Sequence, residues 1–337
     1  MTTTLDDAAR GKQVLVTGAT GYVAGWLVRR LLDAGAIVHG TVRDPSDKDK
    51  VGYLLEMAGN APGSIKLFQA DLLQPGSFDQ AMQGCEVVFH TASPFLPSWK
   101  VQDPQKAFVE PALKGTKNVL ESANRTPSVT RVVLTSSTAA VAAGPADPAT
   151  TPGGIITEAC WNTTSSLENG GYLYSKVVAE RAAWEAAKAQ DRWRLVVINP
   201  GFVLGPGVGP SHTSASFDML KNVGDGSFEQ QVPPIQVGMV DVRDVAEAHF
   251  RAGFLPDAQG RHIVTDEDSS LGELAEFLKV RFGEKFRFPK NTALPAGASK
   301  YRSDNTKSKV ALGMEYRPFK EAAAAMFERL IEAGELN

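Results

Sequence analysis

Tyr172 and Lys176 stand four positions apart in the stretch Tyr-Leu-Tyr-Ser-Lys. On a helix, residues i and i+4 lie on one face. The lysine cation can therefore approach the phenol, favour the phenolate and lower the pKa of the tyrosine. A tyrosine tuned in this way can give a proton to a carbonyl oxygen or take one back. Tyr174 lies between them, but its i+4 partner is Val178 and not a cation. The spacing is weak by itself, because helices carry it by chance.

A run of hydroxyl residues, Thr135-Ser136-Ser137, ends the apolar stretch that begins at Arg131. Ligands of parallel sheets bind outside the carboxyl ends of the strands, so hydroxyls at such an end face the site. A serine there can hold a carbonyl oxygen beside the tyrosine. The competing interpretation is a Ser/Thr cap between a strand and a loop, which is common.

A glycine turn near the N-terminus supplies the context for both motifs. Residues 14–17 are apolar or β-branched, Gly18, Gly21 and Gly25 follow, and apolar residues then recur at helical spacing as far as Asp33. Strand, glycine turn and helix in this order are typical of a dinucleotide-binding motif. The pyrophosphate must reach backbone N–H groups at the helix N-terminus, and a side chain in the turn would block it.

The second expected strand, 38–42, leads into Arg43, and Lys48 follows shortly after. In a dinucleotide fold this strand end faces the adenosine ribose. An acidic residue there would accept from a free 2′-hydroxyl, whereas an arginine pairs with a 2′-phosphate and can stack on adenine. Asp44 argues the other way, and a solvated surface arginine is the alternative. We expect NADPH/NADP+ as the cofactor.

The composition restricts the class of protein. The chain has 337 residues, of which 43% are hydrophobic and 22% charged, as in soluble globular proteins. A net charge of −3 without a long basic run predicts neither nucleic acid nor an anionic membrane as partner. Two cysteines, and no ligand spacing among histidines and acids, predict a reducing compartment and no metal. The polar N-terminus and the lack of a long apolar run predict a cytoplasmic protein that spans no membrane.

Strand and helix patterns alternate six times over the first 200 residues, which predicts an α/β fold with a doubly wound, parallel Rossmann sheet. After Gly201 the rhythm breaks, and we expect a smaller C-terminal substrate lobe. The expected division is a dinucleotide-binding domain of residues 1–200 and a substrate lobe of 201–337, with about 238–266 returning to the sheet. The expected strands are 14–17, 38–42, 65–69, 87–90, 131–135, 195–198 and 262–264, and the expected helices are 26–33, 77–83, one ending near 124, 174–190, one beginning near 241, 271–282 and 318–333.

These motifs together resemble the extended short-chain dehydrogenases/reductases over nearly the whole chain. The sequence is similar to the branch that holds dihydroflavonol reductases, cinnamoyl-CoA reductases and yeast-type NADPH aldehyde/ketone reductases. The motifs that carry this resemblance are Val16-Thr-Gly-Ala-Thr-Gly21, Asp71-Leu72, His90-Thr-Ala-Ser-Pro94, Arg131-Val-Val-Leu-Thr-Ser-Ser137, Tyr172-x-x-x-Lys176, Asn199-Pro200-Gly201 and Val240-Asp-Val-Arg-Asp-Val-Ala246.

The resemblance implies a role for each motif. Ser137 would bind the carbonyl oxygen, Tyr172 would act as the acid and base, and Lys176 would tune it. Asp71 would accept from the adenine amino group, and Pro200 would line the nicotinamide. The expected cofactor contacts are Thr17, Gly18, Thr20, Gly21, Tyr22, Val23, Arg43, Lys48, Asp71, Leu72, Thr91, Ala92, Ser93, Pro200, Gly201 and Val203, and the expected substrate pocket is formed by Phe95, Thr138, Phe202 and Phe217.

Two positions depart from the usual family pattern. Ala24 replaces the last glycine of G-x-x-G-x-x-G, a change that some aldehyde reductases of this branch share. Ala112 stands where many extended members carry an asparagine. A proton relay through that asparagine is not expected, so water or a ribose hydroxyl would serve instead.

The leading hypothesis is an NADPH-dependent carbonyl reductase that transfers hydride to a medium-sized, apolar or aromatic aldehyde or ketone. One alternative is a nucleotide-sugar epimerase or dehydratase that retains NAD, and another is a non-catalytic sensor of NADP. The intact set of Ser137, Tyr172 and Lys176 argues against a sensor. The sequence leaves open the natural substrate, the stereochemistry and direction of the reaction, and whether the protein is a monomer or a homodimer.

Overall fold

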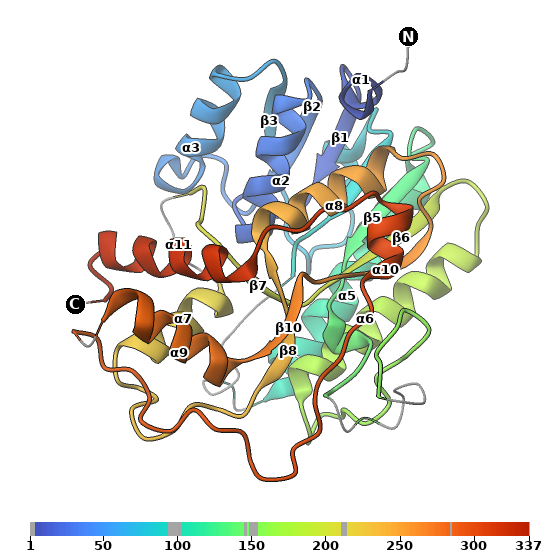
Figure 1. Cartoon of the computed structure of the whole chain (residues 1–337). Helices are drawn as coiled ribbons and strands as arrows, with labels where there is room; N and C mark the ends of the chain where they lie inside the picture. The colour runs from blue at the N-terminus through green and yellow to red at the C-terminus, as the bar shows by residue number, and fades with distance from the viewer. Residues whose placement is uncertain are drawn as a thin grey trace.

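The computed structural model describes residues 4–93, 101, 103–144, 147, 154–209, 214–283 and 285–336. In this described part, seven parallel strands form one sheet in the order β3-β2-β1-β4-β5-β6-β9 (Figure 1). The predicted doubly wound fold is confirmed. The strands are β1 (Gln13–Val16), β2 (Ile37–Val42), β3 (Ser64–Gln69), β4 (Val87–His90), β5 (Arg131–Thr135), β6 (Arg194–Pro200) and β9 (Gly260–Val264).

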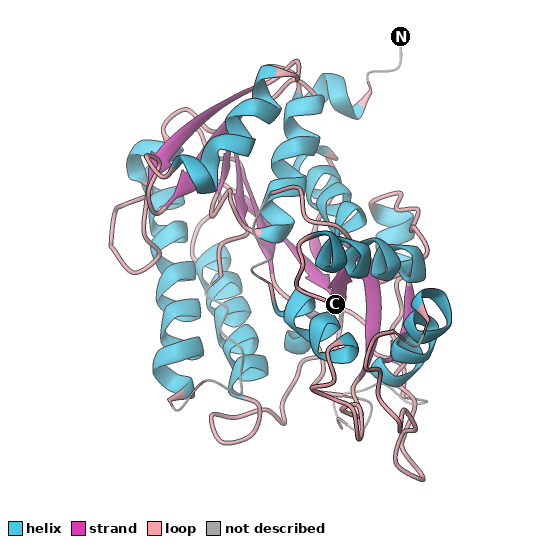
Figure 2. Ribbon diagram, turned by 90° about the vertical axis from the view of Figure 1, so that its left-hand side faces the viewer, coloured by secondary structure: helices cyan, strands magenta, loops and turns pink. Residues whose placement is uncertain are grey.

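Helices cover both faces of this sheet (Figure 2). Val14 and Val16 of β1 pack in the cluster that holds α2 (Tyr22–Asp33) and α8 (Val242–Phe254). Leu15, between them, packs in the opposite cluster with α5 (Glu110–Arg125) and α6 (Gly171–Lys188). Parallel strands buried on both faces read as continuous apolar runs, which is why the sequence showed them. The remaining helices of this part are α1 (Leu5–Ala9), α3 (Lys48–Gly59), α4 (Asp79–Met82), the π-helix η2 (Gln105–Val109) and the 3₁₀ turn η3 (Thr138–Ala140).

In the described part of the chain, a smaller lobe is built around a second sheet of three strands in the order β10-β8-β7. These strands are β7 (Phe202–Leu204), β8 (Gln236–Asp241) and β10 (Glu267–Ser270). The helices α7 (Ala215–Gly224), α9 (Leu271–Phe282) and α11 (Phe319–Glu332) enclose an apolar cluster that includes Phe327. Between β8 and β10 the chain returns to the large sheet, where it forms α8 and the strand β9. The helix α10 (Thr306–Ala311) also contacts β9. The division at residue 200 stays a prediction.

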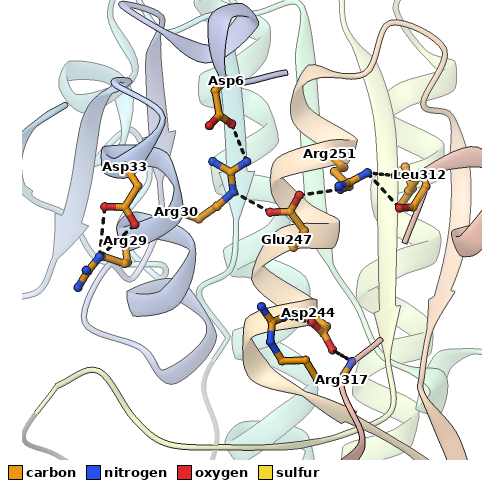
Figure 3. Close-up of polar contacts among 10 residues, drawn as sticks. Asp6, Arg29, Arg30, Asp33, Asp244, Glu247, Arg251, Leu312 and Arg317 are labelled. Carbon is orange, nitrogen blue, oxygen red and sulfur yellow. Dashed lines mark hydrogen bonds and ion pairs between the residues drawn. The ribbon is translucent and has the colours of Figure 1, made fainter. Parts of the chain in front are cut away.

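Ion pairs join α8 to the helices beside it (Figure 3). Arg30 of α2 donates to Glu247 at 2.7 Å and to Asp6 at 2.6 Å, and its guanidinium lies 3.7 Å above the Phe250 ring. Glu247 also accepts from Arg251 at 2.6 Å. This cluster lies on the outer side of α2 and α8, away from the carboxyl ends of the strands, and holds the two helices together.

Two local expectations need correction. We expected the sixth strand to stop at Ile198, but β6 continues to Pro200 because its pairing with β9 extends to Pro200 and Val264; a proline is tolerated at a strand end. The helix expected from 174 begins at Gly171, after Gly170 adopts φ +82°. The first turns of the helix near Pro104 are π-helical, and Pro111 lies inside the first turn of α5.

Candidate active site

The glycine turn lies between β1 and α2, as the sequence predicted. Gly18 adopts φ +65°, and a Cβ added there would come within 3.1 Å of the Ala92 Cβ. Gly21 is the N-cap of α2, and no side chain of the described residues caps this helix. Its first N–H groups are therefore open to an anion, with the positive end of the helix dipole behind them.

The carboxyl ends of β1 and β4 are joined by one hydroxyl group. Thr17 Oγ1 accepts from the backbone N–H groups of Thr91 at 3.1 Å and Ala92 at 3.0 Å. Its own proton must then go to His90 Nδ1, 3.0 Å away, so that histidine carries its proton on Nε2. Burial, with the Lys176 cation nearby, lowers the pKa of His90 to about 3. His90 is therefore a neutral structural residue that places Thr91 and Ala92 beside the glycine turn.

The residues expected at the adenosine end are exposed at strand and helix ends. Arg43 follows β2 and Lys48 begins α3, and both are exposed. The Asp44 carboxylate accepts from the backbone and hydroxyl of Ser46 at 2.8 and 2.6 Å, and these hydrogen bonds lower its pKa, so a negative charge stays next to Arg43. Asp71 is exposed after β3 and accepts from the Leu73 N–H at 2.7 Å.

Tyr172 and Lys176 lie in the first two turns of α6. The Lys176 Nζ atom is 5.5 Å from the centre of the Tyr172 ring and donates to Ser93 Oγ at 3.0 Å. We expected the cation to lower the pKa of Tyr172, but burial raises the pKa of Tyr172 to about 12. Burial also lowers the pKa of Lys176 to about 8. Desolvation outweighs the attraction between the two charges, so the phenol keeps its proton at neutral pH.

The three hydroxyl residues at the end of β5 do different things. Thr135 Oγ1 pairs with His249 Nε2 at 2.6 Å, and Ser136 Oγ donates to Glu180 at 2.6 Å. Ser137 is half-buried and caps the turn η3 by accepting from the Ala139 N–H at 3.1 Å. A hydroxyl that accepts one hydrogen bond still has its proton to donate. Both interpretations of this serine, as a cap and as a carbonyl-binding group, are therefore compatible.

On the side where the nicotinamide is expected, Gly201 lies where β6 passes β8. A Cβ added to Gly201 would lie 1.9 Å from the Gly238 carbonyl oxygen, so this close approach requires glycine. The Tyr22 hydroxyl donates to the Gly205 carbonyl at 2.7 Å. Tyr22 thus holds the chain after β7 against α2 through its hydroxyl.

The four residues expected to form the substrate pocket do not all line one site in the structure. Phe95 lies outside the described residues, and Thr138 is only 3% exposed. Phe202 is half-buried in β7. Phe217 is 2% exposed in the core of the small lobe, with its ring 5.4 Å from that of Tyr22. That position makes Phe217 a packing residue and gives its place in a substrate pocket no support.

Sequence reasoning missed two residues that support the reacting groups. Phe108 of η2 packs its ring edge-on against Tyr172, with 6.0 Å between ring centres. Glu180 of α6 is buried one turn after Lys176. Glu180, Lys176 and Ala112 line a cavity of about 20 Å³. This is room for about one water. The i+4 spacing from Lys176 was visible in the sequence, but a glutamate on a helix gives no sign of burial.

Among the described residues, no group of three or more histidines, cysteines and acids is placed to hold a metal ion. None of the helices in that part of the chain combines the length and apolar character needed to cross a membrane.

The chain matches known proteins over almost its whole length. A sequence model of the NAD dependent epimerase/dehydratase family matches residues 14–264. A cinnamoyl-CoA reductase from Medicago truncatula is 40% identical over 330 residues, covering 96% of both chains. A tetraketide alpha-pyrone reductase from Arabidopsis thaliana is 37% identical over 336 residues, covering 98% of both.

Solved structures agree with these relatives. Gre2 from Candida albicans, in complex with NADPH, has a TM-score of 0.78 and 31% identity, covering 96% of this chain and 99% of that one. The yeast methylglyoxal/isovaleraldehyde reductase Gre2, also with NADPH, has a TM-score of 0.80 and 28% identity, covering 96% and 100%. The chain therefore belongs to the NAD dependent epimerase/dehydratase family, the extended short-chain dehydrogenases/reductases that its motifs indicated.

Proposed function

We propose that this protein is an NADPH-dependent carbonyl reductase that converts an aldehyde or ketone of medium size, apolar or aromatic, to the alcohol. The observation that carries the proposal is the protonated phenol of the half-buried Tyr172 with the Lys176 ammonium over its ring. Its relatives bear out the expectation of a reductase, and the NADPH complexes of the two Gre2 proteins bear out that of the cofactor.

The residues present suit NADPH. The uncapped N-terminus of α2 and the side-chain-free turn at Gly18 leave room for a pyrophosphate. Arg43 and Lys48 are exposed at the position expected for a 2′-phosphate, and the neighbouring Asp44 carboxylate accepts from the Ser46 hydroxyl. When bound, NADPH supplies the hydride.

The chain's own residues then handle the carbonyl oxygen. We place this oxygen between the Ser137 hydroxyl and the Tyr172 phenol, both of which donate to it. As hydride reaches the carbon, negative charge develops on the oxygen, and Tyr172 transfers its proton there to complete the alcohol. The phenolate left behind is stabilised by the Lys176 cation nearby. A phenol with a pKa of about 12 keeps its proton until the oxygen becomes a strong base.

The substrate class is the least restricted part of the proposal. The relatives are named for cinnamoyl-CoA, a tetraketide pyrone, methylglyoxal and isovaleraldehyde, which share a carbonyl group and little else. An apolar or aromatic substrate is favoured by the half-buried Phe202 on β7. We further propose a cytoplasmic enzyme that acts as a monomer or homodimer.

The test is NADPH oxidation by the purified protein across aromatic aldehydes, aliphatic ketones, diketones, dihydroflavonols and an aryl acyl-CoA thioester. We expect turnover of at least one aldehyde or ketone, abolished by Tyr172→Phe. A protein that purifies with bound NAD and oxidises no NADPH would support the epimerase or dehydratase alternative. NADPH binding without turnover of any carbonyl would support the sensor.

A further inference from the structure

Glu180 is a buried carboxylate that the reaction proposed above does not use. It lies on α6 four residues after Lys176 and eight after Tyr172, on the same face of the helix. Only 1% of the residue is exposed. Burying a carboxylate is unfavourable unless it is paired and hydrogen-bonded, so the contacts of Glu180 show what the burial achieves.

Four donor residues converge on this carboxylate, one from α6 itself and three from β6, β9 and the end of β5. Oε2 accepts from Ser136 Oγ at 2.6 Å and from Asn199 Nδ2 at 2.9 Å. Oε1 accepts from Trp184 Nε1 at 3.1 Å and lies 2.6 Å from Arg261 Nε. Arg261 is itself buried on β9, and its guanidinium lies 4.1 Å above the Trp161 ring. The charge of Glu180 is therefore balanced inside the protein.

The strand ends that Glu180 holds are those that carry expected site residues. Ser136 immediately precedes Ser137 at the end of β5, and Asn199 immediately precedes Pro200 at the end of β6. Asn199 Nδ2 also donates to the Ser137 backbone carbonyl at 3.1 Å. The carboxylate thus links the helix of the proton donor to both strand ends through direct hydrogen bonds.

We infer that Glu180 is a positioning residue that fixes the distance between the Ser137 hydroxyl and the Tyr172 phenol. The inference rests on the proposed function for its effect on turnover, but its structural part stands apart from it. Catalysis is sensitive to such placement, because a displacement of about 1 Å between reacting groups can lower the rate roughly 10²-fold.

Glu180→Gln is the variant of choice because it keeps the shape of the side chain. A glutamine presents an NH₂ group to donors at one of its two positions. Either Ser136, Asn199 and the Arg261 Nη2 group, or Trp184 and the Arg261 Nε group, then lose their acceptor. We expect kcat to fall roughly 10- to 100-fold. The Kd for NADPH should change little, because the glycine turn does not contact this carboxylate.

Glu247→Gln is the matched control. Glu247 is a helical glutamate paired with two arginines, Arg30 and Arg251, and it lies on the outer side of α8 (Figure 3). Glu247→Gln removes one negative charge, as Glu180→Gln does, and it weakens two ion pairs where Glu180→Gln weakens one. It should keep the wild-type kcat. Both variants are assayed at a temperature where circular dichroism shows them folded. If Glu180→Gln does not fold, Ser136→Ala, which removes one donor only, takes its place.

The decisive measurement is a double-mutant cycle with Ser137→Ala. If Glu180 acts by placing Ser137, Glu180→Gln should lower kcat far less in the Ser137→Ala background than in the wild type. If the fold-losses in kcat of the two single variants simply multiply in the double variant, the inference is overturned.

Hydrogen exchange followed by mass spectrometry gives a readout that needs no turnover. Peptides covering residues 135–140 and 199–201 should exchange faster in Glu180→Gln, or in Ser136→Ala, than in Glu247→Gln. Unchanged exchange there would refute the positioning role even if the wild type reduced no carbonyl, and an inactive wild type with faster exchange in the variant would refute only the proposed function.

Discussion

Replacing Lys176 by methionine should make the cofactor-free protein more stable at neutral pH while it removes activity. Lys176 is 9% exposed, and burial lowers its pKa from 10.5 to about 8. The unfolded chain therefore binds the proton more tightly than the folded protein does. Below pH 8 the protonated lysine destabilises the folded state, and this penalty disappears as the pH rises from 8 to 10.5.

The magnitude follows from the two pKa values. The gap between 10.5 and about 8 corresponds to about 3 kcal/mol of destabilisation at pH 7, at about 1.4 kcal/mol per pH unit. Losing the hydrogen bond from Lys176 to Ser93 costs about 1 kcal/mol in the other direction. We therefore expect Lys176→Met to raise the free energy of unfolding by about 2 kcal/mol at pH 7. At pH 10 most of the penalty is gone, so the gain should vanish.

The assay is urea denaturation of wild type and Lys176→Met, without cofactor, at pH 7 and pH 10. The difference in gain between the two pH values, about 2.5 kcal/mol, does not depend on the hydrogen bond. Lys106→Met, at a side chain that is 79% exposed, controls for the new methionine. A Lys176→Met gain that is the same at both pH values, or a loss of stability at pH 7, would show that Lys176 is not held in the desolvated state described here.

Three other substitutions test the site. Tyr172→Phe should lower kcat by about 10²- to 10⁴-fold with little change in NADPH affinity by fluorescence titration; near-normal turnover of every carbonyl would rule out the proton donor. Arg43→Glu should lower the ratio of NADPH to NADH efficiency roughly 10- to 100-fold, the value of one or two charge-assisted hydrogen bonds; an unchanged ratio in steady-state kinetics would contradict the cofactor assignment. Gly201→Ala, whose Cβ would lie 1.9 Å from the Gly238 oxygen, should lower the free energy of unfolding by about 2 kcal/mol or more. Gly52→Ala, with nothing within 4 Å of its Cβ, should not, and equal urea midpoints for the two variants would contradict the packing argument.

Much of the large sheet could be predicted from the chain alone. The strands at 87–90 and 131–135 were expected with the bounds that the structure has. Their side chains are buried on both faces, so each leaves a continuous apolar run in the sequence. The glycine turn was also visible, because only a turn without side chains can present backbone N–H groups to a phosphate.

The pKa of Tyr172 could not be predicted in this way. The spacing to Lys176 showed that a cation would be close, but not that Lys176 would be buried and Tyr172 half-buried. Burial acts on each of them through all the elements packed around α6, including Phe108 of η2. The desolvation of Tyr172 by all of its neighbours therefore raises its pKa, whereas the pair with Lys176 alone was expected to lower it.

The amino-acid sequence by itself determined the family, the positions along the chain of the seven strands of the large sheet and the types of the reacting groups, because these follow from short-range periodicity and from motifs of a few residues. Only the tertiary structure decided which buried groups support them. Glu180 meets Arg261 across 81 residues and Ser136 across 44. The packing of the sheet and helices brings these partners together, and the local sequence does not show which distant residues will be in contact.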